Sequence, residues 1–160
     1  SLTGHLVLST IHTNDSAGAF PRLIDMGCEP FLIATSIMGV MAQRLVRVLC
    51  PHCKEEHTPT DVELRSLELN REQVRGATIF RAKGCNHCNQ KGYIGRSLIQ
   101  ELMLINDEIR SLIMQRKDGA TIKKEAIRNG MITFREHGIQ KVLAGITTIE
   151  EVLTSTQMDV

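Results

Sequence analysis

Two short cysteine pairs near the middle of the chain carry its most specific chemical pattern. They are Cys50-Pro51-His52-Cys53 and Cys85-Asn86-His87-Cys88. Each is a C-x2-C knuckle, a spacing that lets both sulfurs point at one small ion. Two knuckles together offer four thiolates in a tetrahedron, the closed arrangement that structural zinc prefers. The pattern therefore predicts a structural zinc site, and because all positions around the ion are filled by sulfur, a site without catalytic activity.

Other uses of these cysteines have to be weighed against zinc. A disulfide framework requires an oxidising compartment and would leave one of the five cysteines, Cys28, without a partner. Two independent redox pairs are a second alternative. The interleaved His52, His57 and His87 are competing ligands in principle, but with four thiolates available we expect them to be bystanders.

Composition limits the classes of protein to consider. The 160 residues are 42% hydrophobic and 23% charged, which is typical of a globular protein of one or two domains. The formal net charge is only +1, and there is no block of like charge. Four Phe, one Tyr and no Trp offer little for base stacking. Composition therefore argues against nucleic acid and against an anionic membrane surface as partners. The longest apolar run, 30–43, is too short to span a bilayer.

The N-terminal part has the pattern of an α/β fold. Residues 4–12 are apolar and β-branched, which predicts a buried strand of a parallel sheet. The cap-forming cluster 13–16 predicts a helix that ends at Gly27, with a kink or a late start because Pro21 falls inside it. A second helix, apolar on nearly every face and buried in the core, is expected from Pro30 to about Arg44. A strand over 45–49 then leads into the first knuckle.

The remainder of the chain is predicted to be mainly helical. Thr60 and Glu63 form a capping-box pattern at the start of a helix over 60–69. Thr148 and Glu151 repeat this pattern before the last helix. The predicted strands are 77–81 and 93–105, and the predicted C-terminal helices are 107–115, 121–129, 134–143 and 149–154.

Several segments resemble, in order, one known family. Residues 3–14 (TGHLVLSTIHTN) look like the histidine box of the type II secretion and type IV pilus assembly ATPases. Residues 22–33 fit the helices that follow in that family, and 42–47 (AQRLVR) fit its approach to the tetracysteine site. Residues 92–96 (GYIGR) and Glu101-Leu102 match the stretch after that site. The resemblance spans essentially the whole chain and is nearest to the type II secretion ATPases.

The resemblance implies an architecture and a cellular setting. The implied fold is α/β: the C-terminal part of a RecA-like ATPase core over 1–49, an inserted tetracysteine zinc-binding subdomain over 50–92 and a mainly helical subdomain over 93–160. It also implies a cytoplasmic homo-hexamer, peripheral to the bacterial inner membrane, that uses ATP and Mg²⁺. Its partners would be the inner-membrane secretion platform proteins, on which it drives pseudopilus assembly.

One departure from the family pattern bears on activity. The sequence contains no G-x-x-x-x-G-K-[ST] motif and no Gly-Lys pair, so the loop that cradles phosphates is missing. The acidic strand that supports Mg²⁺, which the family has upstream of the histidine box, is missing too. We therefore expect the chain to be the C-terminal part of the enzyme, with no cofactor-binding residues for ATP of its own and no activity alone.

Three residues are candidates for the ATP site. His12 ends the predicted first strand, and by resemblance it would sense or position the γ-phosphate end of the site; otherwise it is a strand-end histidine bonded to a neighbour. Arg22 and Arg96 would neutralise charge across a subunit boundary, as arginine fingers do. The alternative for both arginines is a surface ion pair, for instance Arg22 with Asp25 on one helix.

Two other functions stay open from the sequence. A type IV pilus assembly ATPase would share the chemistry and differ in cargo. A zinc-ribbon module that binds nucleic acid or protein would account for the four cysteines alone, but the long gap between knuckles and the near-neutral charge disfavour it. A P-loop upstream in the intact gene would discriminate between an ATPase and such a module.

Overall fold

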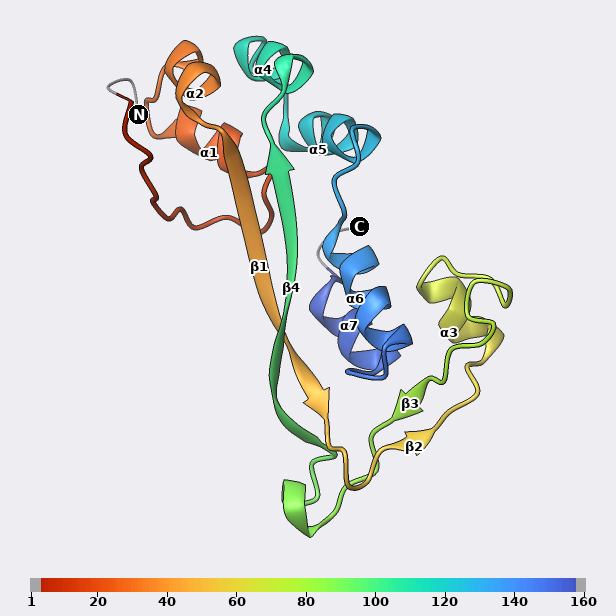
Figure 1. Ribbon diagram of the computed structural model, residues 1–160. Helices are drawn as coiled ribbons and strands as arrows, with labels where there is room; N and C mark the ends of the chain where they lie inside the picture. Colours follow the sequence, from red (N-terminus) through yellow and green to blue (C-terminus); the bar gives the residue numbers. More distant parts are fainter. Residues whose placement is uncertain (1–3, 158–160) are drawn as a thin grey trace. The chain divides into compact units, whose positions relative to one another are not determined.

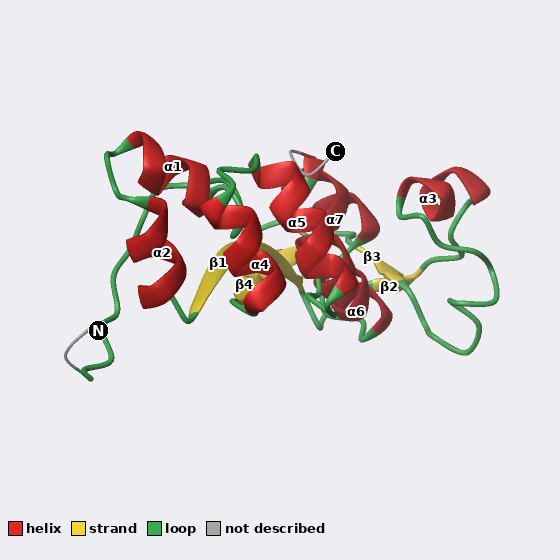
Figure 2. Cartoon of the chain, turned by 90° about the horizontal axis from the view of Figure 1, so that it is seen from above, coloured by secondary structure: helices red, strands yellow, loops and turns green. Residues whose placement is uncertain are grey.

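The computed structural model describes residues 4–157, which fall into two compact units. The first combines the described part of Ser1–Gln43 with Gln100–Thr133, and the second combines Arg44–Ile99 with the described part of Phe134–Val160. None of the described helices is long and apolar enough to cross a membrane. The elements (Figures 1 and 2) are, in chain order, α1 (Ala19–Asp25), α2 (Pro30–Ser36), β1 (Gly39–Leu49), β2 (Glu55–Glu56), α3 (Asp61–Ser66), β3 (Phe80–Arg81), η1 (Asn86–Cys88), β4 (Tyr93–Leu104), α4 (Asp107–Met114), α5 (Gly119–Arg128), α6 (Phe134–Leu143) and α7 (Ile149–Ser155).

Residues 4–12 form no strand, so the predicted buried parallel strand is wrong. The side chains of Leu6, Val7 and Leu8 are 76%, 64% and 88% exposed. An apolar run becomes a buried strand only where neighbouring strands take up its hydrogen bonds and other elements cover its faces. No described strand pairs with this segment, so within residues 4–157 its backbone has no sheet to join.

Helix α1 starts late, as Pro21 indicated. It begins at Ala19, after the cap-forming cluster, and ends at Asp25, close to the predicted stop at Gly27. Pro21 therefore lies in the first turn, where a missing backbone N–H leaves no helical hydrogen bond unmade. The side chain of Asp15 accepts a hydrogen bond from the Gly18 N–H at 2.8 Å, so the cluster forms a turn before the helix.

The second predicted helix, from Pro30 to about Arg44, is wrong beyond Ser36. Helix α2 starts at Pro30, but β1 begins at Gly39. A continuous apolar run fits a buried helix and a strand equally well, and here the pairing of β1 with β4 decides. The expected burial of this run also fails in part, because Phe31 and Met38 are 60% and 72% exposed.

Each of the two sheets among the described residues has two strands. Strand β1 pairs with β4, and the arrows of Figure 1 run in opposite directions. At one end the Ile105 N–H donates to the Met38 carbonyl at 3.0 Å, and at the other the Cys50 N–H donates to the Gly92 carbonyl at 2.9 Å. Strands β2 and β3 are antiparallel as well. The predicted strand over 93–105 is confirmed by β4, while only Phe80–Arg81 of the predicted 77–81 is a strand.

The first unit has a core of helices packed beside one end of the β1–β4 ribbon. Helix α2 packs on α4, α4 on α5, and α1 on both α2 and α5. Helices α4 and α5 match the predictions over 107–115 and 121–129 to within two residues. The largest fully buried apolar side chains of this core are Phe20, Met103, Ile109, Ile113 and Ile122.

The second unit has its own core, formed by α6, α7 and the segments around α3. Helices α3, α6 and α7 start where the sequence predicted, and α6 covers all of 134–143. Thr60 and Glu63 form the predicted capping box. At α7 only half of the predicted box forms: the Thr148 hydroxyl accepts the Glu151 N–H at 3.2 Å, but the Glu151 carboxylate binds Arg47 instead.

Helices α6 and α7 approach closely at Gly138, and this contact gives a first prediction. A Cβ atom at Gly138 would lie 2.6 Å from Cγ1 of Val152, well inside van der Waals contact. We expect Gly138→Ala to lower the free energy of unfolding by about 1–3 kcal/mol through overpacking, measured by chemical denaturation. Gly119→Ala is the control, since a Cβ there meets its nearest atom at 3.6 Å. Equal stability of the two variants would contradict the packing described here.

Candidate functional site

The two cysteine knuckles meet in the second unit. The four Sγ atoms all lie within 4.8 Å of one another. Cys50 Sγ is 3.9 Å from Cys85 Sγ, and Cys88 Sγ is 3.8 Å from the sulfurs of both Cys53 and Cys85. A tetrahedral ion with bonds of about 2.3 Å to sulfur sets its ligands about 3.8 Å apart. The four residues predicted as metal ligands therefore have the spacing of a tetrathiolate centre.

The same distances decide against disulfides. Bonded sulfurs lie about 2.05 Å apart, whereas the knuckle sulfurs that face each other are separated by 3.8–3.9 Å. All five cysteines are free, and Cys28 is exposed on the surface, outside the cluster. The arrangement is that of a metal-binding cluster of thiols.

Tight backbone turns direct the thiols inward. Three backbone N–H groups donate to sulfur: Gly84 to Cys53 at 3.3 Å, and Cys85 and Gly92 to Cys88 at 3.2 and 3.1 Å. Gly92 has a φ of +77°, and a Cβ there would lie 2.7 Å from Cβ of Ala82. A side chain at this position would push the second knuckle away from β3, so glycine is required.

The thiols do not ionise alike. Burial raises the pKa of Cys53 to about 12. Burial also opposes ionisation of Cys88, but the N–H donors of Cys85 and Gly92 outweigh it and lower the pKa of this thiol to about 6. This lower pKa favours the thiolate form of Cys88, which is the form that binds a metal. A bound cation would favour the thiolate form of the other three.

The histidines near the knuckles lie outside the sulfur cluster. The rings of His52 and His87 stack on each other with centroids 4.2 Å apart. His57 Nε2 lies 3.0 Å from a carboxylate oxygen of Glu63, at the capping box of α3. The cluster of possible ligands among the described residues contains the four cysteines only, in agreement with the bystander role expected for all three histidines.

The three residues predicted for an ATP site are all exposed. His12 lies on the irregular segment before α1, Arg22 on α1 in the first unit, and Arg96 on β4 in the second unit. No ion pair between Arg22 and Asp25 is present among the described residues, so the alternative offered for this arginine is not realised. Exposure does not test whether these three side chains act at an ATP site, so their roles stay predictions.

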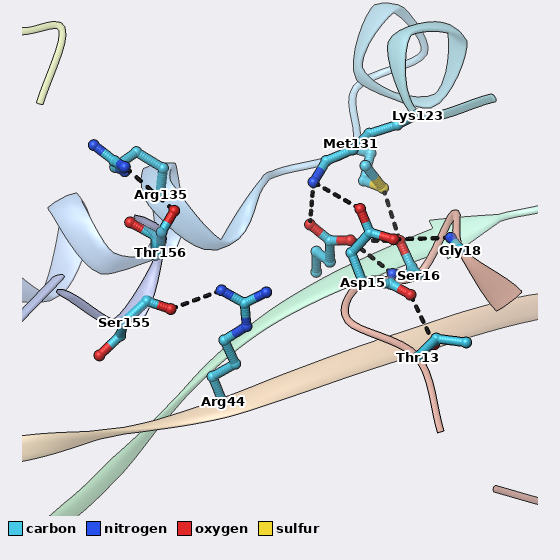
Figure 3. Close-up of polar contacts among 11 residues, drawn as sticks. Thr13, Asp15, Ser16, Gly18, Arg44, Lys123, Met131, Arg135, Ser155 and Thr156 are labelled. Carbon is cyan, nitrogen blue, oxygen red and sulfur yellow. Dashed lines mark hydrogen bonds and ion pairs between the residues drawn. The ribbon is translucent and has the colours of Figure 1, made fainter. Parts of the chain in front are cut away.

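Sequence reasoning missed a buried polar cluster in the first unit. Glu101, on β4, is 0% exposed, and its Oε1 accepts hydrogen bonds from the Ser16 N–H at 2.8 Å and the Ser16 hydroxyl at 2.7 Å. Lys123 Nζ lies 3.7 Å from Glu101 Oε2. The same ammonium group lies 3.1 Å from Asp15 Oδ2 (Figure 3). A glutamate in the apolar alternation of β4, with Ile99 and Met103 on the same buried face, was the available signal.

Two arginines of β1 hold the C-terminal helices within the second unit. The Arg44 guanidinium donates to the Ser155 carbonyl at 2.6 Å (Figure 3) and lies over the ring of Phe134. Arg47 donates to Glu151 from Nε at 2.8 Å and from its backbone N–H at 2.9 Å. The guanidinium of Arg47 also covers the ring of Tyr93. These contacts give both arginines a structural role within the second unit.

Comparison with known proteins agrees with the order of the motifs. The family described as "Type II/IV secretion system protein" matches residues 1–154. The chain belongs to this family. Among its relatives are the type IV pilus assembly ATPase PilB of Thermus thermophilus, 49% identical over 98% of this chain, and the type II secretion system protein E of Pseudomonas aeruginosa, 48% identical over 98% of this chain. The type II secretion system ATPase E of Vibrio cholerae is 48% identical over the same share.

This member of the secretion family covers only part of its relatives. It spans 18% of the Thermus protein and 31% of the Pseudomonas and Vibrio proteins. The mixed α/β structure and the family match fit part of an ATPase domain. The match also favours membership of the secretion family over the zinc-ribbon module that the cysteines alone allowed.

Proposed function

We propose that this chain is the C-terminal part of a cytoplasmic, hexameric ATPase that powers type II protein secretion by driving pseudopilus assembly. The observation that carries the proposal is the similarity of almost the entire chain to a protein named type II secretion system ATPase E. The part of the chain that shares it includes the histidine-box segment and both knuckles. The complete enzyme would act at the inner-membrane secretion platform.

The metal centre has a structural role in this proposal. Cys50, Cys53, Cys85 and Cys88 would hold one Zn²⁺, and their sulfur separations fit its tetrahedral geometry. Four protein ligands leave no position for water or substrate, so the ion would stabilise the fold and take no part in hydrolysis. Binding of the ion would contribute folding free energy to the short segments around the knuckles.

ATP and Mg²⁺ would be bound largely by residues outside this chain. Since the sequence has no P-loop, the phosphate cradle and its lysine have to come from another part of the enzyme. From this chain, His12 would lie at the γ-phosphate end, and Arg22 and Arg96 would neutralise charge from across a subunit boundary. A guanidinium suits this task because it keeps its charge and matches phosphate oxygens in pairs.

The proposal predicts how activity divides between this chain and the complete enzyme. The 160-residue chain alone should hydrolyse no ATP, and the longer protein should do so. In the longer protein, His12→Ala is expected to lower kcat by roughly 10²-fold, because it removes a hydrogen-bond donor at developing charge. An unchanged kcat in the His12→Ala enzyme would contradict the assignment of His12. A coding sequence upstream without G-x-x-x-x-G-K-[ST] would contradict the ATPase proposal altogether.

A type IV pilus assembly ATPase is the second candidate, favoured by the 49% identity to the Thermus protein of that name. Chemistry does not separate the two, because both would use the same ATP site. Complementation does: the complete gene would be placed in strains lacking the type II secretion ATPase or the pilus ATPase. Restored secretion of exoprotein, with no restored piliation, is the result expected from the first candidate.

A further inference from the structure

Three separate segments of the first unit meet at one buried carboxylate. The turn before α1, strand β4 and helix α5 contribute Ser16, Glu101 and Lys123. Glu101 and Ser16 are both 0% exposed, and the two hydrogen bonds from Ser16 to Oε1 are 2.7–2.8 Å long. The Ser16 hydroxyl also lies 3.6 Å from the Met131 sulfur (Figure 3). The turn before α1 is therefore bound, through the N–H and hydroxyl of Ser16, to buried Glu101 on strand β4.

Lys123 supplies the opposing charge. Its ammonium group lies 3.1 Å from Asp15 Oδ2 and 3.7 Å from Glu101 Oε2, and its side chain is only 16% exposed. Among the described residues, Glu101 Oε2 has no hydrogen bond, so the nearby ammonium group is what compensates its charge. A buried carboxylate without a cation is strongly disfavoured. Lys123 thus couples Glu101 to the turn residue Asp15.

Asp15 in turn organises the backbone on both sides of it. Its Oδ1 accepts the Gly18 N–H at 2.8 Å, and its carbonyl accepts the Thr13 hydroxyl at 2.9 Å. Thr13 directly follows His12, and residues 4–12 belong to no helix or strand. The Asp15–Ser16 turn, three to four residues beyond His12, therefore anchors the chain that carries His12 to the buried core of the first unit.

We propose that Glu101 and Lys123 are positioning residues that hold the Thr13–Gly18 turn, and through it His12, in the geometry needed for ATP hydrolysis. The inference rests on the proposed role of His12 at the γ-phosphate. Neither Glu101 nor Lys123 would touch the nucleotide; both would act through His12. Apolar side chains in place of Ser16, Glu101 and Lys123 would fill the same space with no buried charge. They would, however, give the turn no directional hydrogen bonds. Placement errors of about 1 Å in a catalytic group cost about 10²-fold in rate.

The test uses the complete ATPase, with kcat and KM for ATP measured beside thermal unfolding. Lys123→Met keeps the apolar stem and removes the charge, and we expect kcat to fall roughly 30-fold while KM changes less than about twofold. Lys123→Arg restores the charge and is expected to recover most of the rate. Lys124→Met is the matched control, because Lys124 is the exposed neighbour on α5 and its variant should keep the rate of the parent enzyme.

A double variant separates positioning from a merely structural role. If Lys123 acts through His12, Lys123→Met should slow the His12→Ala enzyme no further. Losses that multiply in the double variant would overturn the inference, as would a Lys123→Met enzyme with normal kcat beside a slow His12→Ala enzyme. In both of those cases the proposed function would stand. A normal kcat in the His12→Ala enzyme would overturn the role of His12 and the positioning inference with it.

Ser16→Ala provides a second route if Lys123→Met does not fold. It removes one hydrogen bond to Glu101 and leaves the ion pairs in place. We expect a fall in kcat of roughly fivefold, from a loss of about one hydrogen bond, and again no further loss in the His12→Ala background. A parental kcat for Ser16→Ala, or a loss that persists without His12, would overturn the inference.

Discussion

Replacement of Cys50 by serine is expected to release the metal and unfold the segment that carries the knuckles. Cys50 is buried, and its sulfur lies 3.9 Å from that of Cys85. Structural zinc contributes on the order of 10 kcal/mol to small metal-binding domains, because the site exists only in the folded state. A serine oxygen replaces a soft thiolate by a poor zinc ligand. Elemental analysis should find less than stoichiometric zinc in the variant, and circular dichroism should show a lowered unfolding temperature.

Cys28→Ser is the matched control for this prediction. Cys28 is exposed and lies outside the cluster, so its variant should keep both the metal and the unfolding temperature of the parent. Prolonged dialysis of the parent against a strong chelator should reproduce the effect of Cys50→Ser. A Cys50→Ser variant that retains its zinc and its thermal stability would show that the tetrathiolate assignment is wrong.

The second large effect is expected at Arg47. The Glu151 carboxylate is 9% exposed, whereas the Arg47 side chain is 53% exposed. Arg47→Met removes the guanidinium from this buried carboxylate. Of the hydrogen bonds that residue 47 donates to Glu151, only the one from its backbone N–H would remain. Loss of one partner of a buried ion pair costs 3–5 kcal/mol, and since the guanidinium is half in water we expect about 3 kcal/mol. Chemical denaturation of the variant measures this difference in unfolding free energy.

Two further variants make that measurement specific. Arg128→Met removes an exposed arginine, 76% accessible, that pairs with Glu125 on α5, and it should cost less than about 0.5 kcal/mol. Glu151→Leu in the Arg47→Met background removes the stranded carboxylate and should recover part of the loss. Arg47→Met with a stability within about 0.5 kcal/mol of the parent would refute the importance of the pair.

The metal site was predictable because its information is local. Each C-x2-C pair fixes two ligands within one turn, and four thiolates have few other stable uses. Local geometry also determines Gly92, since the turn after the second knuckle has a positive φ at this position. Helix caps such as Thr60 and the proline at the start of α2 were equally legible. In each case the residues that determine the structure lie within one or two turns of chain.

The features that the sequence did not predict depend on residues that are far apart in the chain. The run from Pro30 to about Arg44 changes from helix to strand at Gly39, because β4, far along the chain, offers hydrogen-bond partners to its second half. Ser16 and Glu101 are separated by 85 positions, and no spacing rule connects them. The position of Glu151 predicted a capping box, but its carboxylate accepts hydrogen bonds from Arg47 and not from the N-cap backbone. Local patterns do not determine such outcomes when a distant partner competes.

Metal content, measured together with thiol accessibility on the purified chain, tests the tetrathiolate centre most directly. Elemental analysis gives the ion and its stoichiometry, and a thiol-reactive dye counts the accessible cysteines. We expect one zinc per chain, with Cys28 the one thiol that reacts readily with the dye. No zinc, together with five reactive thiols in the folded chain, would contradict the tetrathiolate assignment.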